Sequence, residues 1–191
     1  MKRSLFLLIV LSVAFACIAQ EHLSFKGIPL EGRMDAFCKQ LSTKGFKPIG
    51  YDNNQALFTG DFTGRSAKVG VIAADDGENV YSVIVFFDAS DEWKVLTNIY
   101  NYYKDLYTRK YGKPTTVVEK NSATKSVNPS DFEYMHGLIS GTATWGSLWS
   151  VAGGEIEITI EKLNYTEGTV VIRYRDIQNE EAKILKHLEE I

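Results

Sequence analysis

The sequence predicts an α+β fold made of two tandem units, each a helix followed by a four-stranded antiparallel sheet, with a further helix at the C-terminus. Three observations support this prediction. Short strand-like runs are separated by turn residues, and this spacing favours antiparallel strands, because parallel strands need long crossovers. A long amphipathic segment, 90–112, divides the chain into similar halves. Segments 38–48 and 103–114 have related sequences, which indicates an internal duplication.

The segment 90–112 is the clearest helix in the chain. Ser90 is placed to cap its start, while Gly112 and Pro114 are placed to end it. Its apolar residues recur at three- and four-residue steps, so one side of the helix is expected to pack against a sheet. This apolar stripe consists of Leu96, Ile99, Tyr100, Tyr103, Leu106 and Tyr107.

The first unit spans residues 20–89 and begins with a short extended segment. A helix is expected over 33–44, ended by Gly45. Cys38 lies on the apolar face of this helix, and we interpret it as a small buried side chain rather than a reactive thiol. Four strands follow at 46–51, 56–62, 67–73 and 80–87. The last strand is apolar on both faces, so we expect it at the centre of the sheet and covered on both sides.

The second unit spans residues 90–191 and repeats this order with an insertion, a polar loop expected to be mobile at 120–130. Apolar residues alternate with Glu or Arg along its last two strands. This pattern predicts a hairpin with one buried face and one exposed lattice of opposite charges. The expected strands are 115–119, 141–151, 155–163 and 169–175, and the expected closing helix is 179–191. The two units are expected to form one compact domain.

Residues 1–19 have the pattern of a secretory signal peptide, in which Lys2 and Arg3 precede an apolar stretch and small residues. The apolar stretch is too short to predict a membrane span. Two processing routes are open. Cleavage after Ala19 would release an unmodified protein, whereas Cys17 would be the lipid-modified first residue of a lipoprotein. Both routes predict export to the periplasm or the cell surface.

Composition argues against several functional classes. The chain of 191 residues has a net charge of −3, and loss of the two basic residues of the leader would change this to −5. Mild acidity argues against binding to nucleic acid or to an anionic membrane surface. The sequence has no phosphate-binding glycine loop, no paired-cysteine motif and no His-Glu-x-x-His. Neither a cofactor nor a metal site is therefore predicted.

The stretch 134–149 is the main candidate for a binding site. Trp145 and Trp149 are four residues apart, so they share one side of a regular strand. If exposed, they would form an aromatic platform for a sugar ring or a protein partner; if buried, they belong to the core beneath the central helix. Tyr134 and His136 lie in the same stretch and complete the candidate set.

An enzymatic alternative uses groups of the region 131–147. Ser140 or Ser147 would act as the nucleophile of a hydrolase, His136 as its base and Asp131 as the orienting carboxylate. Neither serine lies in a Gly-x-Ser-x-Gly turn, so no catalytic residue is predicted and the alternative ranks second.

The segment 27–46, G-I-P-L-E-G-R-M-D-A-F-C-K-Q-L-S-T-K-G-F, resembles the N-terminal pattern of uncharacterised exported proteins of Bacteroidota. This resemblance implies bacterial export and brings no catalytic residues. The tandem order of helix and four strands also looks like the layout of the β-lactamase-inhibitor-protein family, which binds partners through its sheet. That family is normally disulfide-bonded, whereas cleavage after Ala19 would leave Cys38 alone here, so its target is not carried over.

These features predict an exported, non-enzymatic binding protein of the bacterial cell envelope. Its partner would be a protein or an envelope polymer such as a glycan, held on a face of the sheet. A hydrolase and a purely structural envelope component are the two alternatives.

Overall fold

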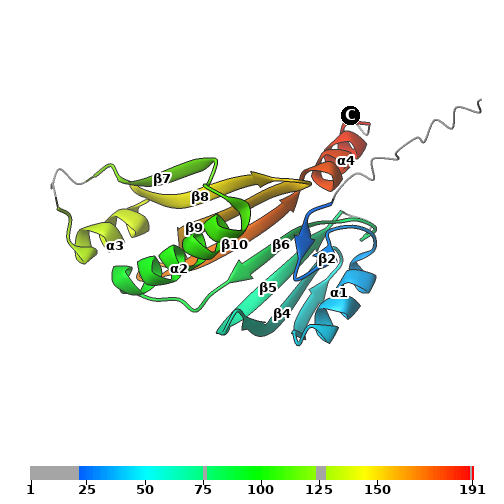
Figure 1. Ribbon diagram of the computed structural model, residues 1–191, viewed down its shortest axis with the longest axis horizontal. Helices are drawn as coiled ribbons and strands as arrows, with labels where there is room; N and C mark the ends of the chain where they lie inside the picture. Colours follow the sequence, from blue (N-terminus) through cyan, green and yellow to red (C-terminus); the bar gives the residue numbers. More distant parts are fainter. Residues whose placement is uncertain (1–21, 75–76, 124–127, 190) are drawn as a thin grey trace, which may run out of the picture.

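The computed structural model describes residues 22–74, 77–123, 128–189 and 191, so the predicted leader lies outside the described residues (Figure 1). Within them the chain is an α+β protein with four helices, one large antiparallel sheet and a small hairpin, which confirms the predicted class. The strands are β1 (Ser24–Phe25), β2 (Ile28–Pro29), β3 (Lys47–Asp52), β4 (Gln55–Phe62), β5 (Arg65–Ala73), β6 (Val80–Phe86), β7 (Thr116–Asn121), β8 (Ala143–Val151), β9 (Gly154–Lys162) and β10 (Gly168–Asp176). The helices are α1 (Met34–Thr43), α2 (Trp93–Tyr111), α3 (Asp131–Ser140) and α4 (Ile177–Leu188).

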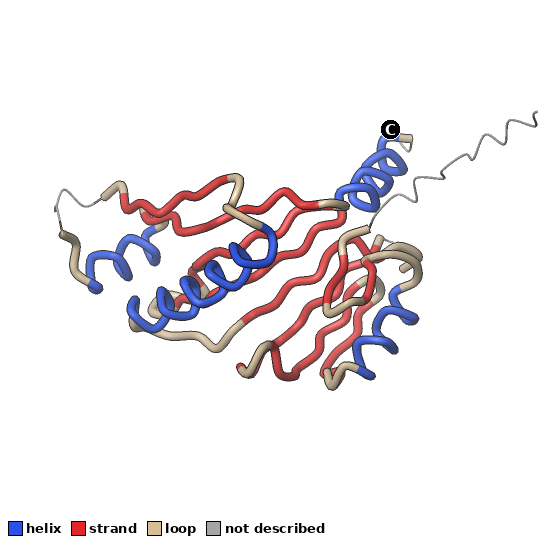
Figure 2. The backbone as a smooth tube through the Cα atoms, in the orientation of Figure 1, coloured by secondary structure: helices blue, strands red, loops and turns tan. Residues whose placement is uncertain are grey.

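The large sheet has eight strands in the order β3-β4-β5-β6-β10-β9-β8-β7. Strands β3 to β6 form one side of this sheet, β7 to β10 form the other, and the two groups meet where β6 pairs with β10. Figure 2 shows the sheet running without a break from one group to the other. The central position of β6 agrees with its apolar sequence.

Helices α1 and α2 and the β1–β2 hairpin pack on one face of this sheet, with α1 against β5 and α2 across β9 and β10 (Figure 1). The side chains beneath them form a single continuous core. One row of five in-register side chains crosses the sheet under this layer, and each is 0% exposed. The row consists of Phe58, Val69, Val85, Ile172 and Ile158. Removing such apolar surface from water is the main force that holds the layers together.

Helix α2 carries the predicted apolar stripe, with Leu96, Tyr100 and Tyr103 fully buried. It ends as expected at Gly112, which has a positive φ of 86°. Its start differs from the expectation, because Glu92 and not Ser90 is the N-cap residue. The backbone of Ser90 is instead paired with that of Gly168 by two hydrogen bonds of 3.0 and 2.9 Å, so Ser90 extends the sheet.

No helix is expected from the sequence over 131–140, yet α3 fills this segment. Ser130 and Glu133 form a capping box, in which the Ser130 hydroxyl accepts from the Glu133 backbone and the Glu133 carboxylate accepts from the Ser130 backbone. Gly141 ends the helix in the left-handed conformation. Both signals are present in the sequence, but they lie next to the polar stretch 120–130 that is expected to be a loop.

Helix α4 projects from the end of β10 (Figure 1). It starts at Ile177, two residues before the expected position, and Asp176 caps it through a hydrogen bond to the Asn179 backbone. None of its side chains is buried, and its apolar residues Ile184, Leu185 and Leu188 are exposed to solvent.

Candidate functional site

The face of the sheet opposite α1 and α2 is here called the open face. A second in-register row of side chains crosses the sheet on this face, and none of them is buried. The row consists of Leu57, Gly70, Ile84, Arg173 and Glu157. The expectation that β6 is covered on both faces is therefore wrong for Ile84 and Phe86, whose side chains stay partly exposed on this face.

On the β3–β6 side, the open face has an apolar centre around Gly70, where an uncovered sheet face is ordinarily polar. Polar residues follow farther along the strands, such as Gln55, Thr59 and Lys68. Residues of four strands, β3 to β6, line a hollow of about 430 Å³ around Gly70. Gly70 supplies the floor of this apolar hollow, because it has no side chain between its larger neighbours. The surrounding apolar side chains are Leu57, Ile72, Ile84 and Phe86. Leu57 is 36% exposed, so part of this surface is in contact with water.

On the β7–β10 side, the open face carries the predicted lattice of Glu and Arg. The Arg173 guanidinium binds both carboxylate oxygens of Glu161, with a distance of 2.8 Å between Nη2 and Oε2. Glu157 lies on its other side at 3.7 Å, and Arg175 pairs with Glu155. Partial burial opposes the ionisation of Glu161, but hydrogen bonds from Arg173 and Thr159 hold its pKa below the ordinary value.

The two tryptophans predicted to share a side do so, but they face α2 and not the open face. Trp149 is 1% exposed, and its indole N–H donates to the backbone oxygen of Gly112 at 2.9 Å. The core alternative therefore applies to Trp149, which anchors the end of α2. Trp145 lies nearer the surface between α2 and α3, where its ring meets that of Trp93 edge-on at 5.1 Å.

Tyr134 joins Trp145 in an aromatic cluster with Trp93, whereas His136 does not. The Tyr134 ring stacks on Trp93 at 5.1 Å and meets Trp145 edge-on at 5.4 Å. His136 is exposed on another side of α3, beside the ring of Phe132. The sequence contains a signal for Trp93, since it continues the apolar stripe of α2 one step towards the N-terminus.

The groups of the hydrolase alternative do not form a catalytic arrangement. Ser147 is buried beneath α2, and its hydroxyl lies 2.6 Å from that of Tyr100. Because Tyr100 donates its own proton to Glu119, Ser147 donates to Tyr100. The Ser140 hydroxyl donates to a backbone oxygen of its own helix. Within the described part of the chain, no hydrogen bond joins His136 to either serine.

Cys38 is buried in α1 beneath the β3–β6 side of the sheet. Burial, with a smaller contribution from Asp35, raises the pKa of its thiol to about 11. The thiol is therefore protonated at neutral pH, as the sequence interpretation expects.

No protein-family model, curated protein or solved structure matches the chain. The resemblance to exported Bacteroidota proteins and to the inhibitor layout therefore stays a prediction. In the described ranges, no helix is both long and apolar enough to cross a membrane. Nor do three or more His, Cys, Asp or Glu side chains of those ranges gather where they would hold a metal ion.

Proposed function

We propose that the chain is an exported, non-enzymatic binding protein that holds a protein partner on its open face. The apolar hollow around Gly70 is the observation that carries this proposal. Protein interfaces combine an apolar centre with a polar rim. The open face has the same composition, with aliphatic side chains around the hollow and charged side chains along β9 and β10.

The chemistry of the hollow favours a protein over an envelope polymer such as a glycan. A sugar chain brings many hydroxyl groups, and each one that is buried needs a hydrogen-bond partner. Leu57, Ile72 and Ile84 offer none. The polar side chains that line the hollow lie at its β3–β4 end and are Tyr51, Asp52 and Gln55. An apolar side chain of a protein partner would fill the same space without leaving a polar group unpaired.

The proposal includes the tandem organisation expected from the sequence. Two observations support it. The four consecutive strands of each group remain neighbours in the sheet. Helices α1 and α2 each pack on the third strand of their group in chain order, β5 and β9 respectively. The related segments 38–48 and 103–114 also occupy equivalent places, since both end a helix at a glycine of positive φ. Export is proposed from the leader pattern of residues 1–19.

The proposal is tested by photo-crosslinking in cells that naturally produce the chain. A benzophenone amino acid is placed at Leu57, beside the hollow, or at Tyr165, which is 88% exposed in the β9–β10 turn. We expect one protein to be crosslinked from position 57 and not from position 165. The variant Leu57→Arg, checked for folding by circular dichroism, should lose the same partner in affinity capture. No crosslink at position 57, or equal crosslinking at both positions, would show that the open face is not the binding surface.

A further inference from the structure

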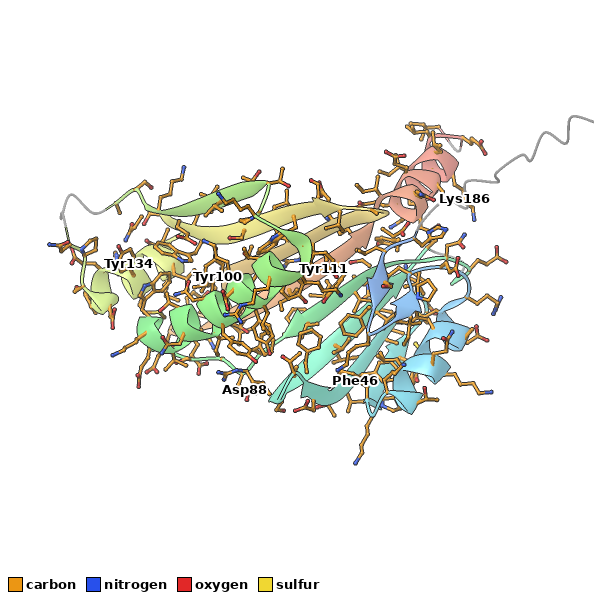
Figure 3. All side chains as sticks on the ribbon, in the orientation of Figure 1. Phe46, Asp88, Tyr100, Tyr111, Tyr134 and Lys186 are labelled. Carbon is orange, nitrogen blue, oxygen red and sulfur yellow. The ribbon has the colours of Figure 1, made fainter. Side chains whose placement is uncertain are left out.

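A second cavity lies on the opposite side of the sheet, under the helix layer, where the two groups of strands meet. Its volume is about 320 Å³. The C-terminal half of α2 forms one wall, and the β1–β2 and β4–β5 turns form the other. Tyr174 of β10 belongs to the same cavity, here called the tyrosine pocket. Figure 3 labels Tyr111 at the end of α2, where the helix approaches the hairpin.

Both turns of the tyrosine pocket place a residue other than glycine at a positive φ. Lys26–Gly27 and Thr63–Gly64 each have two positive φ angles, as in a type I′ turn. Asn, Asp and Gly are the usual residues at such positions, and a β-branched residue such as Thr63 is an outlier. The Thr63 hydroxyl lies 2.8 Å from the Phe62 carbonyl oxygen and 2.9 Å from the Tyr103 hydroxyl.

Two phenols of the tyrosine pocket leave one hydroxyl proton without an acceptor. The hydroxyls of Tyr107 and Tyr174 form a hydrogen bond with each other. Burial raises the pKa of both groups above the ordinary value, so both are protonated at neutral pH. The two phenols carry two protons, and their mutual bond uses one. Among the hydrogen bonds of the described residues, none takes the second proton, which is free to bind an acceptor on a ligand.

The charges at the tyrosine pocket are positive only. Lys26 and Lys110 line it, and no Asp or Glu does. The Lys26 ammonium lies over the Phe62 ring at 5.5 Å, and the Lys110 ammonium lies over the Tyr111 ring at 4.7 Å. Neither lysine forms an ion pair within the described ranges. In a chain of net charge −3, two such lysines at one cavity indicate an anionic ligand.

We propose that the tyrosine pocket binds a small aromatic carboxylate. Its ring would pack against Phe62 and Leu106, and its carboxylate would bind Lys26, Lys110 and the free hydroxyl proton. The size agrees, because an apolar cavity of about 150 Å³ holds benzene. A cavity of about 320 Å³ therefore has room for one ring with a short acidic side chain. This site is separate from the open face and does not depend on the function proposed there.

Isothermal titration calorimetry of the purified protein with 3-phenylpropanoate tests the proposal, with 3-phenylpropanol as the neutral analogue. We expect the acid to bind about tenfold more tightly than the alcohol, since a charge-assisted contact is worth about this factor. The double variant Lys26→Asn/Lys110→Gln should weaken binding of the acid by about tenfold or more. Asn tolerates the positive φ of position 26, so the turn should persist. Lys113→Gln removes an exposed lysine outside the cavity and should change nothing.

Three further results would overturn the proposal. Equal affinities for acid and alcohol would show that the lysines do not select an anion. Binding that survives Leu106→Trp, a variant that fills the cavity, would place the ligand elsewhere. No binding of 3-phenylpropanoate at millimolar concentration would also reject the proposal. The open-face variant Leu57→Arg should bind the acid normally, which separates a failure at this site from a failure of the proposed protein binding.

Discussion

The carboxylate of Asp176 accepts a hydrogen bond from the backbone N–H of Leu23 at 2.9 Å, across 153 positions of the chain. The same fully buried carboxylate accepts from the Asn179 backbone at 3.0 Å and lies 3.1 Å from His22 Nδ1. The Asn179 side chain donates in turn to the backbone oxygens of Leu30 and Val80. One aspartate therefore ties the first described residues to the last strand and the last helix.

Replacement of this aspartate should destabilise the protein. Asp176→Ala removes a helix cap and leaves the Leu23 N–H buried without an acceptor. We expect the free energy of unfolding to fall by about 2–4 kcal/mol. Asp176→Asn keeps one acceptor oxygen and should cost less. Urea denaturation measures both, and an alanine variant as stable as the wild type would contradict the assigned role.

Gly154 should not tolerate a larger residue. A Cβ atom at this position would lie 2.0 Å from the backbone oxygen of Arg175 in the paired strand. Because a backbone atom cannot move aside cheaply, we expect Gly154→Ala to lower the free energy of unfolding by about 1–3 kcal/mol. Gly50→Ala is the matched control, since its Cβ would meet no atom within 4 Å. Equal melting temperatures for the two variants would contradict this account.

The Arg173–Glu161 pair should make stability depend on acidity. The pKa of Glu161 is lower in the folded chain than its ordinary value of 4.5. The pair therefore stabilises the fold above about pH 4.5, and this contribution is lost as the pH falls through the lowered pKa. Between pH 7 and pH 3, the wild type should lose more stability than Glu161→Gln. Urea midpoints across this range measure the difference, and parallel curves for the two proteins would rule out the pair as a cause.

The two tryptophans of β8 should differ in their contribution to stability. Trp149→Ala empties a fully buried site and should cost about 3–5 kcal/mol. Trp145→Ala removes a partly exposed ring and should lower the free energy of unfolding by less than Trp149→Ala does. Thermal unfolding compares them. A larger loss at Trp145 would mean that the aromatic cluster with Trp93 and Tyr134, rather than the core below α2, holds this end of the sheet.

Local patterns predicted much of the fold. Helix α2 and the β9–β10 hairpin follow from periods of about four and two residues, which depend only on neighbouring positions. Helix α3 was missed because its signals at Ser130, Glu133 and Gly141 are short and border a polar stretch. The tyrosine pocket and the apolar hollow were both missed. Their residues come from distant strands and turns, and no local pattern links Lys26 to Tyr174 or Leu57 to Ile84.

The sequence by itself determined most of the segments that form strands and helices, α3 excepted, and which residues alternate along the strands. Only the tertiary structure decided that β6 meets β10, that Trp149 lies beneath α2, and that Leu57 and Ile84 stay uncovered. The physical reason is that every strand has two faces and two edges. The alternation of residue types distinguishes the two faces of a strand. Packing between parts of the chain that are far apart in sequence decides which face a helix covers and which strand pairs at each edge.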